Sequence, residues 1–289
     1  MNKVYIKIAL ALLSVAGYMQ NIAFASDHAA ATTSSNVKDK QQVSIDHEEA
    51  IEAKGLMADA LALAKMHAKC PKNYRMYHKE DEEAIIYFKK LSNVDIGKLE
   101  LTIHNPDSYD DIVNMLWDPN GPKNYDDMFD KGSIFRTYNE NLVIVQQHYD
   151  GPSGTWDLHC HALASKFQLS EDETAIVFAP SDMSGPGSDS YQTYENPIVE
   201  SASISTPDIY SEESIIGGKL SQIFVNLVAF FIKKEADCVK IIHISSIEHG
   251  VPLYVPYDIL ESIIIKKMIN VINLRDIFKK KKHNFKWTF

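Results

Sequence analysis

Apolar positions along the chain repeat with two different periods, and each period predicts its own kind of element. A helical period covers residues 46–69 and the region from Tyr257 to about Lys280, and a shorter helix is predicted from Pro106 to Trp117. Segments rich in β-branched and aromatic residues lie between the helices and predict about eight strands. These segments are Ala84–Lys90, Lys98–His104, Ser133–Tyr138, Leu142–Tyr149, Trp156–Leu169, Thr174–Ser181, Ile198–Ile204, Ile223–Ile232 and Val239–Ile247. The order predicts an α+β fold in which the helices lie on one side of an antiparallel sheet.

The last predicted helix is more apolar than a peripheral helix needs to be. Its polar residues recur every three or four positions and form one stripe: Asp258, Glu261, Ser262, Lys266, Asn270, Asn273, Asp276 and Lys279. Apolar side chains cover the rest of its surface. A sheet closed by such a helix encloses either a large solid core or a container for an apolar molecule, and the pattern alone leaves both open.

The first 25 residues have the features of a secretory signal peptide. Lys3 and Lys7 precede an apolar run, and Ala23-Phe-Ala25 provides a small-x-small cleavage site. A retained anchor is the alternative, although the run is short for a membrane span. Residues 26–45 are rich in Ala, Ser, Thr and Lys without periodicity, and predict a disordered leader. We therefore expect a secreted protein.

Composition narrows the possible partners. The 289-residue chain carries 29 basic and 39 acidic residues, a formal net charge of −10, which argues against general nucleic-acid binding. A cluster of basic residues lies at the C-terminal end of the chain, where the tail 283–289 alternates cations with aromatic rings. Such a tail fits transient contact with a membrane surface or a frayed charged terminus. The sequence does not indicate an oligomeric state.

The chain has few residues arranged for covalent or metal chemistry. His159 and His161 share one face of a strand, but no third ligand with supporting spacing accompanies them, so no metal site is predicted. There is no nucleophile elbow, phosphate loop or cofactor motif, and we expect neither an enzyme nor a cofactor. Of the three cysteines, Cys160 is expected to be a small buried apolar residue, and any disulfide would join Cys70 to Cys238.

Several segments between about Leu56 and Lys280 follow one another in a characteristic order. They are Asp111-Ile-Val-Asn-Met-Leu-Trp-Asp118, Lys131-Gly-Ser133, the hairpin Arg136–Tyr149, the pair Trp156-Asp157 and the corner Ser246–Pro252. In this order the chain resembles the START (steroidogenic acute regulatory protein-related lipid transfer) domain, in the version found in the fam-a family of malaria parasites. Trp156 replaces an arginine of the family pattern, and the Gly-to-Pro spacing of the corner is one residue shorter.

The resemblance implies a helix-grip fold over residues 46–282, in which a curved antiparallel sheet wraps the long terminal helix over an internal tunnel. It also implies a secreted carrier for a phospholipid, with phosphatidylcholine as the first choice of lipid and the parasitophorous vacuole or the host cell as the destination. A secreted or surface interaction protein without transfer activity is the alternative, and a hydrolase that uses the histidines ranks third. The volume of the cavity separates the first two, because ligand-sized pockets hold several hundred Å³.

The resemblance also assigns lipid-binding positions. On one predicted strand Leu142, Ile144 and Gln146 share a face, and Leu158, Cys160 and Ala162 do so on the strand opposite. Matched to the family pattern, these are the cavity side, with Gln146 as a polar group for the lipid headgroup. Ile264, Met268 and Ile272 of the last helix are the predicted lid residues. Ordinary core packing is the alternative for each.

Overall fold

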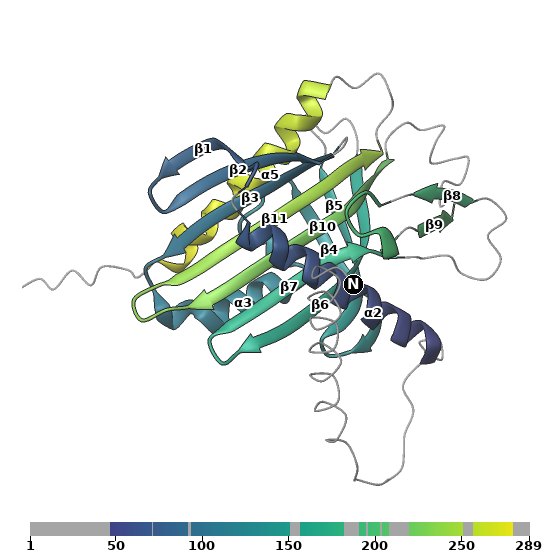
Figure 1. Ribbon diagram of the computed structural model, residues 1–289, viewed down its shortest axis with the longest axis horizontal. Coiled ribbons are helices and arrows are strands. Elements are labelled where there is room, and N and C mark those ends of the chain that lie inside the picture. Colours follow the sequence, from purple (N-terminus) through teal and green to yellow (C-terminus); the bar gives the residue numbers. More distant parts are fainter. Residues whose placement is uncertain are drawn as a thin grey trace, which may run out of the picture. The chain divides into compact units, whose positions relative to one another are not determined.

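The computed structural model describes residues 47–70, 72–91, 94–150, 157–181, 191–194, 196–202, 204–207, 220–250 and 257–279 (Figure 1). The predicted signal peptide (1–25), the leader (26–45) and the tail 283–289 lie outside these residues. Three α-helices are described: α2 (His47–Lys69), α3 (Tyr109–Trp117) and α5 (Tyr257–Phe278). None of the described helices is both long and apolar enough to cross a membrane.

Nine strands form one sheet in the order β1-β2-β3-β11-β10-β7-β6-β5-β4. Their bounds are β1 Arg75–Asp81, β2 Ala84–Leu91, β3 Val94–Ile103, β4 Phe129–Asn139, β5 Leu142–Asp150, β6 Asp157–Ser170, β7 Glu173–Pro180, β10 Leu220–Lys234 and β11 Val239–Gly250. Neighbours in this order are antiparallel. The start of β6 also pairs in parallel with the start of β10, beyond the end of β7. Strands β6 and β10, which flank β7 in the sheet, therefore pair directly with each other beyond its end, and the sheet bends there.

Helices cover both faces of this sheet, so the prediction that they lie on one side is wrong. Figure 1 shows α2 crossing the near face, with α3 and α5 behind the sheet. The residues by which α2 packs are small or flexible and follow helical spacing: Ala53, Met57, Ala60 and Ala64. They contact one face of β6, β7, β10 and β11. The other face carries α5 and α3, in a cluster that includes Met268, Val271, Ile112 and Leu116.

The central strands are apolar on both faces because both faces are covered. In β10, Leu227, Ala229 and Phe231 belong to the cluster under α2, whereas Phe230 and Ile232 belong to the cluster under α3 and α5. In β5, Leu142 and Ile144 point to the first side, and Val143 and Val145 to the second. Such strands show no polar alternation along the sequence.

Most predicted elements are confirmed within a few residues, including α2, α3 and α5. The prediction of about eight strands is too low for the main sheet, because β1 was missed. The predicted strand Ile198–Ile204 is wrong: a 3₁₀ turn occupies Glu200–Ala202, and a short strand, β9, begins only at Ile204. β9 (Ile204–Pro207) pairs with β8 (Tyr191–Tyr194) as a separate two-stranded ribbon. The run Ile198–Val199 is buried under α2 and so is apolar without being extended in a sheet.

Gly97 marks the place where α5 lies closest to the sheet. A Cβ built on Gly97 would stand 2.2 Å from Sδ of Met268, a side chain that is fully buried. We expect Gly97→Ala to lower the free energy of unfolding by about 1–3 kcal/mol, because the buried methionine must move or α5 must lift. Urea unfolding of the purified chain measures this.

Gly55 provides the matched control for this substitution. It lies within α2, and a Cβ there would meet no atom within 4 Å. Gly55→Ala should therefore raise the free energy of unfolding by about 0.5–1 kcal/mol through helix propensity. Equal effects of the two substitutions would contradict the described contact between Gly97 and Met268.

Candidate functional site

A cavity of about 110 Å³ lies between the sheet face that carries α5 and the turn that follows α3. Strand residues provide most of its wall: Val145, Gln147 and Tyr149 of β5, Cys160 and Ala162 of β6, Phe178 of β7, Ile223, Val225, Val228 and Phe230 of β10, and His243, Ser245 and Ile247 of β11. The α3 end and the following turn contribute Leu116, Trp117, Asp118, Pro119, Pro122, Tyr125 and Asp126. Lys267 and Val271 of α5 close it. Most lining side chains are apolar, which suits a hydrocarbon guest.

One end of the cavity carries a buried ion pair. Lys267 Nζ lies 3.4 Å from Asp126 Oδ2, and the two side chains are only 15% and 7% exposed. Asp126 is held by further donors, since its Oδ1 accepts from Asn270 Nδ2 at 2.7 Å and from the Met128 backbone N–H at 3.0 Å. Burial lowers the pKa of Lys267, and the neighbouring Asp126 carboxylate opposes that shift. A buried ammonium is thus fixed in the wall of an apolar space.

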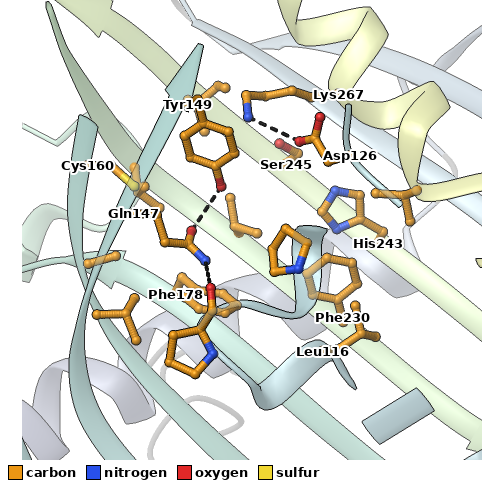
Figure 2. A pocket seen from close by; sticks show the side chains of 18 of the residues that line it. Leu116, Asp126, Gln147, Tyr149, Cys160, Phe178, Phe230, His243, Ser245 and Lys267 are labelled. Atoms are coloured by element: carbon orange, nitrogen blue, oxygen red, sulfur yellow. Dashed lines mark hydrogen bonds and ion pairs between the residues drawn. The ribbon is translucent and has the colours of Figure 1, made fainter. Parts of the chain in front are cut away.

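Tyr149 and Gln147 form a second polar feature beside this pair (Figure 2). The Tyr149 hydroxyl donates to Gln147 Oε1 at 2.9 Å, and Gln147 Nε2 donates to the Pro119 carbonyl at 3.1 Å. Phe129 meets the Tyr149 ring edge-on, and Lys267 Nζ lies 3.2 Å from the ring centroid. Burial raises the pKa of Tyr149 well above its usual value, so the phenol stays protonated. The polar groups of both side chains are therefore already paired.

Two further titratable groups of the wall, His243 and Cys160, are neutral at physiological pH. His243 is stacked on Phe230, and its Nδ1 lies 3.1 Å from the Ala229 carbonyl, which can only accept, so Nδ1 carries the proton. Burial lowers the pKa of His243 to about 4. Burial raises the pKa of Cys160 to about 11, which keeps the thiol protonated and unreactive. Lys267, Asp126 and the exposed Asp118 are the lysine and aspartate residues that line the cavity among the described residues.

The cavity is small for a lipid-binding site. An engineered apolar cavity of about 150 Å³ holds a benzene molecule, and pockets for drug-sized ligands reach about 300–1,000 Å³. At about 110 Å³, the described space takes the end of a chain or a small polar group, but not two acyl chains.

The predicted lipid-binding residues of the strands divide into two groups. Cys160 and Ala162 line the cavity, and Leu158 is buried in the same cluster without lining it. Leu142 and Ile144 lie on the opposite face in the cluster under α2, so their placement on the cavity side is wrong. Gln146 shares their face, and Gln147 is the glutamine that reaches the cavity. The assignment on β5 is one residue out of phase.

The predicted lid positions on α5 are also displaced by one residue. Met268 and Ile272 are buried against the sheet and α3, and Ile264 is half-buried, but none of the three lines the cavity. Lys267 and Val271 occupy the facing positions instead. Adjacent residues of an α-helix point about 100° apart. Because α5 is apolar on most of its surface, the sequence did not show which of its apolar faces lines the cavity.

Sequence reasoning missed the charged pair. The acidic doublet Asp126-Asp127 looks like a solvated pair in the sequence, but Asp126 is buried. Asn270 was placed in the solvated stripe of the last helix, and it is buried too, with hydrogen bonds to both aspartates. The available signal was Lys267, a cation that falls outside the polar stripe on an otherwise apolar face.

The histidines of β5 and β6 face away from the cavity, and the three cysteines form no disulfide. His148, His159 and His161 lie together on β5 and β6, with ring centroids 6.4 and 6.0 Å apart, on the face away from the cavity. Within the described ranges, no group of three His, Cys, Asp or Glu side chains could hold a metal ion. Cys160 is buried as expected, and Cys70, Cys160 and Cys238 are all free thiols, so the Cys70–Cys238 pairing is wrong.

Comparison with known proteins supports the fold. At the level of sequence, no family model and no curated protein matches the chain. Among solved structures, human StAR-related lipid transfer protein 5 is similar with a TM-score of 0.56 at 9% identity, covering 80% of this chain and 97% of its own. Human STARD10 gives 0.50 at 8% identity (74% and 79% covered), and the human StarD13 (DLC2) lipid transfer and protein localization domain gives 0.50 at 11% (76% and 96%). The described chain therefore has a START-like fold.

Proposed function

We propose that this protein binds a lipid in the cavity beneath α5. The observation that carries the proposal is an apolar cavity, closed by a helix on a START-like sheet, that has a charged pair at one end. Apolar walls remove acyl chain from water at about 0.8 kcal/mol per buried methylene, so uptake needs no covalent step and no cofactor. The protein is accordingly proposed to be a carrier rather than an enzyme.

Loading a whole lipid requires α5 to move. The helix is held to the rest of the domain by separate polar contacts: Asn105 Nδ2 donates to the Phe278 carbonyl at 2.8 Å, and Arg275 pairs with Asp81 at 2.6 Å. Together with Asn270 and Lys267, these contacts tie the helix along its length. A helix displaced as one piece would enlarge the 110 Å³ space by exposing the apolar face of the sheet.

The finer parts of the proposal come from the sequence. The signal peptide 1–25 directs the protein out of the cell, and the tail 283–289 attracts it to a lipid surface while it loads. Phosphatidylcholine, a member of the phospholipid class that the family resemblance favours, is the first lipid to test. If the chain belongs with the fam-a proteins of malaria parasites, its destination is the parasitophorous vacuole or the host cell.

The size of the cavity favours a second candidate function. A space of about 110 Å³ lies below the range of lipid tunnels and suits a START-like scaffold whose interior has filled with side chains. Such a protein would act through its surface, as a secreted or surface interaction protein.

Lipid extraction from the purified chain separates the two functions. The protein is produced in lipid-rich cells, and bound lipid is identified by mass spectrometry and quantified per mole of protein. A near-stoichiometric lipid, together with transfer of labelled phosphatidylcholine between vesicles, supports the carrier. A lipid-free protein that neither binds nor transfers any lipid offered favours the interaction protein.

A further inference from the structure

Lys267 in the cavity wall does not use all of its hydrogen-bond donors. An ammonium has three N–H donors. Asp126 accepts one of them at 3.4 Å, which is long for a charge-assisted hydrogen bond, and the face of the Tyr149 ring receives a second at 3.2 Å from the ring centroid. Among the described residues, no other hydrogen bond or ion pair of Lys267 is seen.

Asp126 pairs with Lys267 through one carboxylate oxygen only, at 3.4 Å. Its Oδ1 is taken by two N–H donors, from Asn270 and Met128, both at 3.0 Å or less, and only Oδ2 faces the ammonium. The aspartate is thus held chiefly by the turn and by Asn270, while the lysine nitrogen is drawn over the ring. The positive charge consequently remains directed toward the cavity.

Three other polar groups of the wall, Tyr149, Gln147 and His243, are already engaged. Tyr149 and Gln147 are bonded to each other and to the Pro119 carbonyl, and His243 is neutral with its Nδ1 proton on the Ala229 carbonyl. A quaternary ammonium would meet a like charge here, and the Tyr149 ring face that could receive it is covered by Lys267. Figure 2 shows Lys267 and Tyr149 at one end of the cavity, with Phe178, Phe230 and Leu116 toward the other.

On this geometry, and resting on the proposed lipid binding, we infer that the ligand is a single-chain lipid whose anionic oxygen end is bound by Lys267, with its chain over the apolar wall. A free carboxylate fits better than a choline phosphoester because the cavity holds about 110 Å³, which leaves room for a small head only. Asp126 and Tyr149 act as positioning residues that hold the ammonium. A fatty acid is the natural probe.

The test compares oleate with its uncharged methyl ester on the full chain at pH 7.4, by equilibrium dialysis of labelled ligand. We expect oleate to bind at least tenfold more tightly than methyl oleate. Lys267→Met should remove this preference, because the affinity for oleate falls to that for methyl oleate. Lys266→Met is the matched control, since Lys266 is half-exposed, neighbours Lys267 on α5 and pairs with Asp127, and it should alter neither affinity.

The double variant Asp126→Asn/Lys267→Met keeps the test valid if the single variant does not fold, because it leaves no unpaired buried charge. It should lose the preference for oleate in the same way. Three results would each overturn the inference without refuting lipid binding. The wild type could bind oleate and methyl oleate equally, or the double variant could keep the preference for oleate. Lysophosphatidylcholine could also bind more tightly than oleate and continue to bind after the loss of Lys267. Failure of the wild type to bind any of these ligands would instead refute the proposed function.

Discussion

Replacing Asp126 with alanine is expected to lower the free energy of unfolding by about 3–5 kcal/mol, because it leaves the Lys267 ammonium buried without a counter-charge. Asn270 and the Met128 N–H lose their acceptor in the same substitution. For a domain of this size, each kcal/mol corresponds to about 2–4 °C in Tm. Urea denaturation followed by circular dichroism gives the free energy, and differential scanning calorimetry gives the Tm.

The adjacent residue supplies the control. Asp127 also contacts α5, through Lys266 at 3.0 Å and Asn270 at 3.0 Å, but its side chain is 65% exposed. Asp127→Ala should change stability by no more than about 1 kcal/mol, as exposed ion pairs do. Asp126→Ala/Lys267→Met should recover part of the loss, because an apolar pair of similar volume removes the uncompensated charge. If Asp126→Ala and Asp127→Ala lowered the free energy of unfolding by the same amount, the Asp126–Lys267 ion pair would not be buried in solution.

The two-sided burial of the sheet explains why the cavity face could not be predicted from β5. The run Leu142–Val145 is apolar at every position, since α2 covers one face and the cavity cluster lies on the other. Alternation identifies a face only when the other face is polar. Pairing would have shown the inconsistency: Ala162 pairs with Val145 and Cys160 with Gln147, so Ile144 and Gln146 cannot share their face.

The elements themselves were predictable because their signals are local. Proline at the start of the α3 region, the long periodic run of α5 and the β-branched strands mark their own positions. Strand β1, Arg75–Asp81, has no such signal: it is an exposed edge strand with a polar sequence. The buried pair Asp126–Lys267 joins residues 141 positions apart, and only tertiary packing brings an acid of a turn to a lysine of the last helix.

The largest functional effect is expected from Ala162→Phe, which should abolish lipid binding. Ala162 lines the cavity and is buried, and a phenyl ring projecting from its Cβ would occupy much of a 110 Å³ space. Because the ring enters empty volume, the Tm should change by only a few degrees. Lipid bound per mole of protein after extraction, and oleate affinity by dialysis, should both fall to background.

Ala164→Phe tests whether the position of the ring, rather than its size, causes the loss. Ala164 lies on the same strand and face as Ala162, and it is buried against Val143 and Phe178 without lining the cavity. A ring there has no empty volume to enter, so overpacking should lower stability by about 1–3 kcal/mol, while protein that remains folded still binds lipid. Ala162→Phe should therefore lose lipid binding and keep its stability, whereas Ala164→Phe should lose stability and keep lipid binding. If folded Ala162→Phe bound lipid as the wild type does, the ligand would have to lie outside this cavity.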